Sequence, residues 1–471
     1  MQQTERSKML GDMPMNRLVP KISLPIMCSM IVQALYNVVD SYFVQKFNPN
    51  AFTAVSLAYP VQMLMIALSV GMGVGISSLL SRKLGAGQRI EARRTVWNGL
   101  LIEAAGSLFF VLLGLFLTPA IMSGLVSDNL QNADVIREMS TSYLSTVTIF
   151  SQGLFMAVLF ERTLQATGNT VYSMITQLSG ALTNIILDPI MIFGLLGFPS
   201  MGCTGAAIAT VTGQFVSAAL GFILNQRKNT ELRLKPAEFA VDVSLISGIM
   251  TVGAPSTVMQ AIGSVMNVGM NGLLSSFDQG NAAVNVLNVY FKLQSFIFMP
   301  VFGLGSGLIA IVGYNFGARR SRRVYQAINV AMIWAGSIML AGMLVFQLLP
   351  QWVMSIFDSE AEPEVALQMR EMGVVALRTI SWAFIPAAIG IVLTNVFQAV
   401  GRGMNSMIMS ICRQLLVLLP IAYLLKALFG TVDSVWWCFV IAEVFSLFLC
   451  LLLFRRCDRD MIRPLGNTES L

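Results

Sequence analysis

The sequence predicts an all-α polytopic membrane protein with twelve transmembrane helices in two pseudo-symmetric six-helix bundles. Three observations lead to this fold class: an apolar composition, a series of long apolar windows and an internal repeat. Of the 471 residues, 55% are hydrophobic and only 11% are charged, and the mean hydropathy is +0.72. Because soluble domains carry about 25% charged residues, this composition indicates a chain that spans a membrane several times.

The apolar windows predict where the helices lie. Windows of about twenty residues, long enough to cross about 30 Å of hydrocarbon, cover 19–43, 55–80, 96–118, 140–165, 171–195, 203–225, 245–274, 282–312, 325–349, 374–400, 404–428 and 435–454. They divide the chain into an N-terminal segment (1–18), a first bundle (19–225), a linker (226–244), a second bundle (245–455) and a tail (456–471).

The two halves of the chain resemble each other. GMGVGISSLLSRKLGAG from Gly71 recurs as GLGSGLIAIVGYNFGAR from Gly303, and QATGNTVYSMI from Gln165 recurs as QAVGRGMNSMI from Gln398. Because six helices separate the copies, this is a parallel repeat about an axis along the membrane normal, which predicts two bundles rocking around a shared cavity. A repeat without transport is the alternative. The glycine-rich runs lack a following Lys-Ser/Thr, so they predict close helix packing and no phosphate loop.

The charges describe topology. The net charge of +6 and the pI of about 9.1 would suit nucleic acid, but Lys and Arg fall in short clusters between the apolar windows. The positive-inside rule then predicts a multi-pass protein of the plasma (inner) membrane with both termini in the cytoplasm. No nucleic acid is expected as a partner.

Other residue types exclude several kinds of chemistry. The six cysteines have no CxxC or metal-ligand spacing, so we expect packing roles, with no metal site and no disulfide. There is no histidine, so proton chemistry near neutral pH must use carboxyl groups. No nucleophile–base constellation or nucleotide motif is present. We therefore expect no catalytic residue, no enzyme activity, no cofactor and no use of ATP, in a monomer that contacts membrane lipid.

The first predicted helix carries an ionisable residue inside its apolar window. Asp40 ends a polar stripe at helical spacings of three and four, which consists of Ser29, Gln33, Tyr36, Asn37 and Asp40. Because an intramembrane carboxylate is costly and is usually functional, the stripe should face protein or water. The alternative for Asp40 is a place in water at the helix end.

The fifth predicted helix supplies a second carboxylate. Gln177, Asn184 and Asp188 share one helical face, and Pro189 follows. Asp40 and Asp188 lie at similar depth in the outer half of the membrane, where Thr204 begins the sixth helix, so these side chains could form one pocket. Two carboxylates in a low-dielectric pocket cannot both ionise cheaply, so one is expected to hold a proton. The same oxygens could alternatively hold Na⁺, and a helix-end role remains the alternative for Asp188.

The second bundle differs in its polar residues. The seventh helix carries a stripe of Gln260, Ser264, Asn267 and Asn271, but no Asp or Glu lies inside 245–274, 282–312, 374–400 or 404–428. The ion site is therefore predicted in the first bundle alone.

Isolated charges complete the candidate residues. Lys292, preceded by Asn285 and Asn288, lies near mid-membrane, and Arg413 and Glu443 are placed to form a structural ion pair, which we favour over a substrate contact. Glu161 and Arg162 are expected to anchor the loop that follows them. The candidate substrate-cavity residues are Gln33, Tyr36, Asn37, Gln177, Gln260, Asn267, Asn271, Asn288, Lys292 and Arg413.

At this point the motifs resemble those of the multidrug and toxic compound extrusion (MATE) family, and within it the bacterial MepA-like and DinF-like branch. The resemblance covers essentially the whole chain, and its motifs are specific only as a set. They are YNVVDSYFV at Tyr36, LGAGQ at Leu84, QATGN at Gln165, NIILDP at Asn184, MGCTGAAIAT at Met201, and NFGA and QAVGR in the second half.

The resemblance implies cation-coupled efflux of lipophilic organic, often cationic, compounds and drugs by alternating access. In the DinF-like branch it implies that Asp40, Asn184, Asp188 and Thr204 bind the coupling ion, with H⁺ favoured over Na⁺. The acids of the sodium-coupled NorM-like pattern in the second half are missing here. The implied cycle loads protons from outside and shifts the first helix near Pro25. The alternatives are a flippase of lipid or lipid-linked oligosaccharide from the same superfamily and a channel or scaffold without transport.

Overall fold

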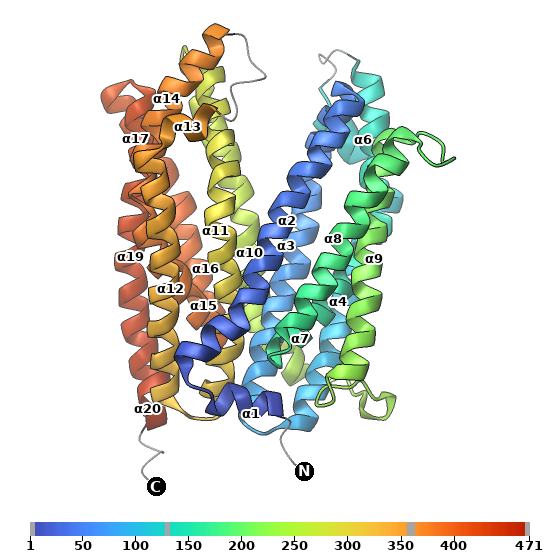
Figure 1. Cartoon of the computed structure of the whole chain (residues 1–471), viewed down its shortest axis with the longest axis vertical. Helices are drawn as coiled ribbons and strands as arrows, with labels where there is room; N and C mark the ends of the chain where they lie inside the picture. The colour runs from blue at the N-terminus through green and yellow to red at the C-terminus, as the bar shows by residue number, and fades with distance from the viewer. Residues whose placement is uncertain (1–4, 128–131, 356–362, 467–471) are drawn as a thin grey trace.

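The computed structural model describes residues 5–127, 132–355 and 363–466. Within these ranges every regular element is helical (Figure 1), which confirms the predicted fold class. Ten helices are long and apolar enough to cross a membrane, and two bent pairs bring the number to twelve if each pair is one span.

The helices gather in two groups (Figure 1). The N bundle consists of α2 (Met15–Phe47), α3 (Pro49–Gly85), α4 (Arg89–Phe116), α5 (Thr118–Leu125), α6 (Ala133–Ile149), α7 (Gln152–Ala166), α8 (Thr170–Phe193) and α9 (Gly202–Lys228). Ahead of it lies α1 (Glu5–Asp12), and the connector to the second bundle contains η1 (Pro236–Glu238).

The C bundle begins with α10 (Val243–Leu274), α11 (Gly280–Gly317), α12 (Ser321–Leu348), α13 (Pro350–Ser355), α14 (Pro363–Ser381) and α15 (Phe384–Ala399). It continues with α16 (Gly403–Ile411), the π-helical turn η3 (Cys412–Leu418), α17 (Leu419–Phe429), α18 (Val432–Val435), α19 (Trp437–Cys457), the π-helical turn η4 (Asp458–Ile462) and α20 (Arg463–Gly466).

Local sequence signals set several helix ends. The side chain of Asp242 caps α10 by accepting hydrogen bonds from the backbone N–H groups of Ser244 and Leu245, at 2.9 and 3.3 Å. α8 ends at Gly194 and α17 ends at Gly430, which have φ of +75° and +66°. Glycine adopts this left-handed conformation without a steric penalty, so it terminates both helices cleanly.

The prediction of single helices over 140–165 and 374–400 is wrong. The first is broken between α6 and α7 with a bend of 45°, and the second is broken between α14 and α15 with a bend of 51°. At each break the backbone makes tighter i→i−3 hydrogen bonds, from Ser151 to Thr148 (3.2 Å) and from Ala383 to Ile380 (2.9 Å). The Ser151 hydroxyl also donates to the Ser107 carbonyl of α4 at 3.2 Å, which holds the first break in place.

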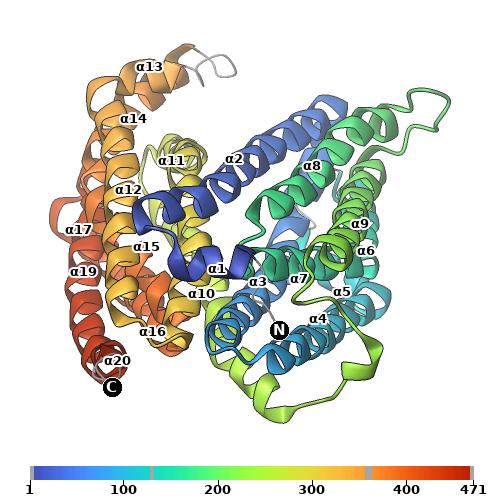
Figure 2. The ribbon, with the colours of Figure 1, turned by 60° about the horizontal axis from the view of Figure 1, so that its bottom comes forward.

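The two bundles pack against each other near the chain termini and diverge toward the opposite end (Figure 1). α2 crosses between them: its first half packs on α11 of the C bundle, and the rest of the helix packs on α8 of the N bundle (Figure 2). Ser23, in the first half of α2, donates a hydrogen bond to the Leu304 carbonyl of α11 at 3.5 Å. α2 therefore belongs to both bundles.

Glycines make the close approach between the bundles possible. A Cβ atom on Gly71 would lie 2.3 Å from Oγ1 of Thr257, and one on Gly303 would lie 2.8 Å from Cα of Met27. At the terminal end, a Cβ atom on Gly85 would lie 1.9 Å from the Tyr314 carbonyl oxygen. These contacts confirm that the repeated glycine runs serve close helix packing.

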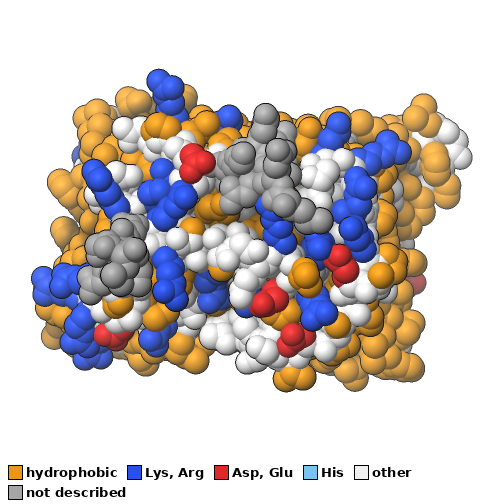
Figure 3. Space-filling view, turned by 90° about the horizontal axis from the view of Figure 1, so that it is seen from below, with side chains coloured by type: hydrophobic (Ala, Val, Ile, Leu, Met, Phe, Trp, Pro, Cys, Tyr) orange, Lys and Arg blue, Asp and Glu red, His pale blue; other side chains and the backbone are white. Residues whose placement is uncertain are grey.

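The face that carries the chain termini is rich in Lys and Arg, which outnumber the acidic side chains visible there (Figure 3). Two basic clusters of the sequence, 319–323 and 455–463, lie where α11 meets α12 and along the end of α19, η4 and the start of α20, and Figure 1 shows α20 at this end of the molecule.

Candidate functional site

The carboxyl groups of Asp40 and Asp188 lie close enough to interact electrostatically. Asp40 is in the C-terminal half of α2 and Asp188 is one residue before Pro189 of α8, and these two helices pack side by side. Asp188 is fully buried and Asp40 is half-buried. The structure therefore brings together the two carboxylates that the sequence predicts as a pair.

Asn184 connects this pair to α9. Its side-chain amide donates to Oδ1 of Asp188 and to Oγ1 of Thr210, each at 3.2 Å. The contact is possible because α8 and α9 approach closely one turn away, where a Cβ on Gly180 would lie 2.9 Å from the Gly213 carbonyl oxygen.

The hydroxyl that contacts Asn184 belongs to Thr210 and not to Thr204, the predicted residue. The Thr204 side chain hydrogen bonds to the Ser142 hydroxyl of α6 at 2.7 Å, and Thr210 takes the place beside Asn184. α8 and α9 are antiparallel, so earlier residues of α8 face later residues of α9: Gly180 meets Gly213, and Asn184 meets Thr210. Depth along each helix does not determine this register. The register is set where Gly180 of α8 meets Gly213 of α9.

Two tyrosines surround the carboxylates. Tyr36 of α2 and Tyr143 of α6 both lie within electrostatic range of Asp40 and Asp188. The Tyr143 hydroxyl donates to Oε1 of Gln62 on α3 at 3.2 Å. Tyr36 was a predicted cavity residue, whereas Tyr143 and Gln62 were not predicted, since neither belongs to a polar stripe.

The carboxylate site presents several buried oxygens. Oδ1 of Asp40, Oδ1 of Asn184 and Oδ2 of Asp188 receive no hydrogen bond from an amide or hydroxyl group of the described residues. Carboxylate and amide oxygens of this kind can hold a proton or coordinate a hard cation. Oε1 of Gln177, two turns before Asn184 on the same helix, is likewise buried without a donor among the described residues.

The C bundle carries neutral polar residues at the related positions. Gln260, Asn267 and Asn271 of α10 are partly exposed, and Oδ1 of each asparagine receives no hydrogen bond from the described residues. No Asp or Glu lies between Val243 and Leu274 or between Gly280 and Gly317, both of which the structure describes in full.

Several predicted cavity residues are exposed within membrane-spanning helices. They are Gln33 and Asn37 of α2 and Asn288 and Lys292 of α11. Polar side chains inside such helices face water or protein and avoid lipid.

Arg413 pairs with Glu443, as the sequence favours. NH1 of Arg413 in η3 lies 3.3 Å from Oε1 of Glu443 in α19. Both residues belong to the C bundle, so the pair joins two of its helices. Arg413 was also a predicted cavity residue, but its charge is paired with Glu443.

A buried acid of α4 was overlooked in the sequence. Glu103 is fully buried, accepts a hydrogen bond from Ser69 at 3.3 Å and interacts electrostatically with Arg162 of α7. It lies inside the third apolar window, where an acidic residue is costly, so the sequence carries the same signal for Glu103 as for Asp40. Arg162 also donates to the Ser306 hydroxyl of α11 at 3.2 Å, across the two bundles.

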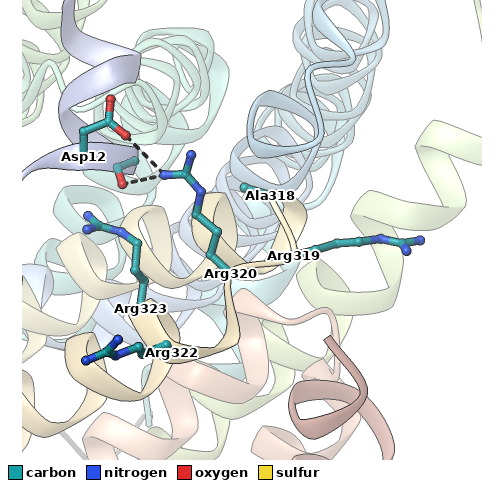
Figure 4. A pocket seen from close by; sticks show the side chains of 7 residues that line it. Asp12, Ala318, Arg319, Arg320, Arg322 and Arg323 are labelled. Atoms are coloured by element: carbon teal, nitrogen blue, oxygen red, sulfur yellow. Dashed lines mark hydrogen bonds and ion pairs between the residues drawn. The ribbon is translucent and has the colours of Figure 1, made fainter. Parts of the chain in front are cut away.

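A separate pocket of about 740 Å³ lies near the N-terminus (Figure 4). Its lining residues are Gly11, Asp12, Ala318, Arg319, Arg320, Arg322 and Arg323. Arg320 donates to the Gly11 carbonyl at 2.6 Å and pairs with Asp12 at 3.2 Å. The pocket therefore marks where α1 is attached to the C bundle.

The fold and this site define a polytopic all-α membrane protein with a carboxylate pair buried in one of two related bundles. A sequence model of the MatE family matches residues 25–190 and 255–424. The chain belongs to this family, the MATE transporters.

Relatives and solved structures agree with this assignment. The chain is 26% identical over 432 residues to the multidrug export protein MepA of Staphylococcus haemolyticus (strain JCSC1435), covering 92% of this chain and 91% of that one. It is 26% identical over 420 residues to an FAD transporter of Shewanella oneidensis (strain MR-1), covering 87% and 88%. An outward-facing structure of a multidrug resistance MATE transporter matches 99% of this chain and 100% of that one with a TM-score of 0.89 and 24% identity, which shows the shared fold.

Proposed function

We propose that this protein is a multidrug efflux antiporter of the plasma (inner) membrane, which couples the export of lipophilic organic compounds, often cationic, to the entry of H⁺. The observation that carries the proposal is the placement of Asp40 beside Asp188 between α2 and α8, with a buried oxygen of each carboxyl group that receives no hydrogen bond from the described residues. Two carboxyl groups so close together in a low-dielectric site cannot both ionise cheaply, so one of them keeps its proton. The pair can therefore hold and release a proton inside the membrane.

The coupling site comprises Asp40, Asp188, Asn184 and Thr210. Asn184 fixes the Asp188 carboxyl group and is itself held by Thr210. Na⁺ is the alternative ion, because the three buried oxygens of Asp40, Asn184 and Asp188 are hard ligands. H⁺ is favoured because two neighbouring carboxyl groups in a low-dielectric site hold one proton between them more cheaply than two negative charges.

The cycle uses the arrangement of the bundles. With both termini in the cytoplasm, the bundles meet at the cytoplasmic side and diverge toward the outside (Figure 1). Substrate leaves from between the bundles in this state, and protons reach Asp40 and Asp188 from outside. α2 carries Asp40 and packs on both bundles, so a shift of α2 near Pro25 would connect proton binding to the contact between the bundles.

Relatives support the substrate class and one alternative. Multidrug export proteins are among them, and the relative that transports FAD extends the candidate substrates to compounds with phosphate groups. A flippase for lipid-linked oligosaccharides would need a strongly cationic path. α10 and α11 together contain one charged residue, Lys292, which favours drug export.

Uptake of ethidium and rhodamine 123 into inverted membrane vesicles under an imposed proton gradient tests the proposal. We expect Asp40→Asn and Asp188→Asn to abolish proton-driven uptake while the variants still reach the membrane. Asp433→Asn, at an exposed acid in the first turn of α18, is the matched control. Uptake that stays at the wild-type level in both Asn variants would reject the coupling site. Dye uptake driven by a sodium gradient in the absence of a proton gradient would identify Na⁺ as the coupling ion.

A further inference from the structure

Lys292 is the single charged residue of α10 and α11, both of which the structure describes from end to end. It lies twelve residues after Gly280, the first residue of α11, which is about 18 Å along the helix. Its side chain is exposed. A charge at this depth is costly unless it faces water or a ligand.

The geometry of α11 places Lys292 on the side that faces the N bundle. Gly303, eleven residues later and thus about three turns away, contacts the backbone of Met27 of α2. Ser306, fourteen residues later and about four turns away, accepts the hydrogen bond from Arg162 of α7. Pro300 lies within the same continuous helix. Lys292 therefore lies on the same face of α11 as Gly303 and Ser306, which pack on the N bundle, but nearer the N-terminal end of the helix.

Burial along α11 gives the same orientation. Val286, Leu287, Val289 and Tyr290 are buried in the C bundle. The exposed residues between and around them are Asn281, Asn285, Asn288 and Lys292. Because these recur every three or four residues, they form one polar face with a cation and amide donors.

The Lys292 ammonium group has no ion pair or hydrogen bond within the described part of the chain. Among the described residues no ion pair joins it to Asp40 or Asp188 of the N bundle: Asp188 is fully buried, and Asp40 lies beside Asp188 between α2 and α8. The other carboxyl group of the C bundle at membrane depth, Glu443, pairs with Arg413. Lys292 is thus available to a ligand.

On the N bundle, α3 contributes an apolar surface. On α3, Leu64 and Pro60 lie about two and three turns before Gly71, which contacts Thr257 of the C bundle. Both are exposed, Leu64 by 53%. A ligand between the bundles would meet these apolar side chains of α3 and, on α11, an ammonium group with amides.

We propose that Lys292, supported by Asn288 and Asn285, binds a carboxylate or phosphate group of the exported compounds, so that amphipathic zwitterions and anions are substrates. The proposal rests on the proposed function and assigns its substrate class. An unpaired ammonium group attracts an anion and repels a simple lipophilic cation. The amides of Asn288 and Asn285, one and two turns away, donate further hydrogen bonds to the same group.

Two dyes with one ring system test this assignment. Rhodamine 110 carries a free carboxylate, and rhodamine 123 is its methyl ester. We measure the KM of proton-driven uptake of each dye into inverted vesicles for the wild type, Lys292→Gln, Lys292→Arg and the control Lys426→Gln. Lys426 is a lysine of α17 that bonds to Ser276.

We expect Lys292→Gln to raise the KM for rhodamine 110 roughly tenfold, the effect of losing a charged hydrogen bond. The KM for rhodamine 123 should stay the same or fall, Lys292→Arg should resemble the wild type, and Lys426→Gln should change neither KM. An equal change for both dyes, or no change for rhodamine 110, would overturn the role of Lys292 and leave efflux intact. Wild-type vesicles that transport neither dye would reject the proposed function as well.

A lipid arm separates the two sources of an anionic group. Movement of fluorescent phosphatidylglycerol between leaflets is measured in proteoliposomes that contain the same variants. We expect no dependence of lipid movement on Lys292. Lipid movement that requires Lys292 without transport of rhodamine 110 would overturn the proposal and identify the anion as a lipid headgroup.

Discussion

Asn184 holds Asp188 from one turn deeper in the same helix, with its amide 3.2 Å from Oδ1 of the carboxyl group. The same amide nitrogen contacts Thr210 of α9 at 3.2 Å. The neutral link between α8 and α9 therefore fixes the geometry of the proposed ion site. Its energy is that of ordinary hydrogen bonds, about 1 kcal/mol each.

Thr210→Val should weaken the ion site without unfolding the protein. Valine keeps the shape of threonine but removes the hydroxyl that accepts from Asn184, so proton-driven dye uptake should fall about fivefold, corresponding to about 1 kcal/mol. Thr204→Val is the matched control, because Thr204 bonds to Ser142 instead. The measurement is the initial rate of dye uptake at equal expression. An equal loss of uptake in Thr210→Val and Thr204→Val would contradict the assignment of Thr210.

Alanine at the glycine contacts should disfavour the arrangement seen here. A Cβ on Gly85 or Gly317 would lie 1.9 or 2.1 Å from a backbone carbonyl oxygen of the other bundle, and such overpacking costs about 1–3 kcal/mol. The bundles should then separate more often near the termini. Spin-label distances between the bundles measure this population.

Gly272→Ala provides the control for these variants. Gly272 lies in α10, and nothing is within 4 Å of a Cβ built there, so its distance distribution should match the wild type. Unchanged distances in both Gly85→Ala and Gly317→Ala would show that the glycines do not set the contact between the bundles.

Breaking the pair of Arg413 and Glu443 should destabilise the C bundle. Both side chains are largely buried, with 24% and 17% of their surface exposed. Glu443→Leu leaves the arginine charge unpaired at a cost of about 1–3 kcal/mol, below the 3–5 kcal/mol of fully buried pairs. The Tm in detergent should fall for Glu443→Leu and recover when Arg413→Met is added. A double variant less stable than the single one would indicate a role beyond pairing.

The attachment of α1 depends on arginines of the α11–α12 turn. Arg320 binds the Gly11 carbonyl and Asp12, and Arg323 binds the carbonyls of Leu10 and Met13 at 3.3 and 2.8 Å (Figure 4). Arg320→Ala should therefore speed hydrogen–deuterium exchange in α1. Arg322→Ala, whose side chain lies away from Asp12 in Figure 4, should leave exchange unchanged. Slow exchange in Arg320→Ala would show that apolar packing alone holds α1.

The sequence was sufficient for the features that depend on composition and spacing. The long apolar windows gave the helices, and the costly placement of Asp40 and Asp188 in two such windows gave their pairing. The glycine runs predicted close helix packing, and the structure places this packing between the bundles. Each of these follows from residues whose burial has a strong physical consequence.

Other features depend on how helices are packed, which spacing alone does not determine. Thr210 replaces Thr204 because the register of α8 against α9 is set where Gly180 meets Gly213. The break at Ser151 occurs without a nearby proline, through a local i→i−3 hydrogen bond. The break at Ala383 is followed by Pro386, which lacks an N–H group and whose ring would clash with the Trp382 carbonyl in a continuous helix. Glu103 lies inside an apolar window as Asp40 does, so the same physical argument applies to it. The orientation of Lys292 required the contacts of Gly303 and Ser306 further along α11.

Proton release on substrate binding tests the central claim most directly. Purified protein in weakly buffered detergent is mixed with rhodamine 123, and the released protons are counted with a pH indicator against bound dye. The account predicts about one proton per bound dye for the wild type and none for the Asp40→Asn/Asp188→Asn double variant. Equal proton release from the double variant, or dye binding to the wild type without any release, would contradict it.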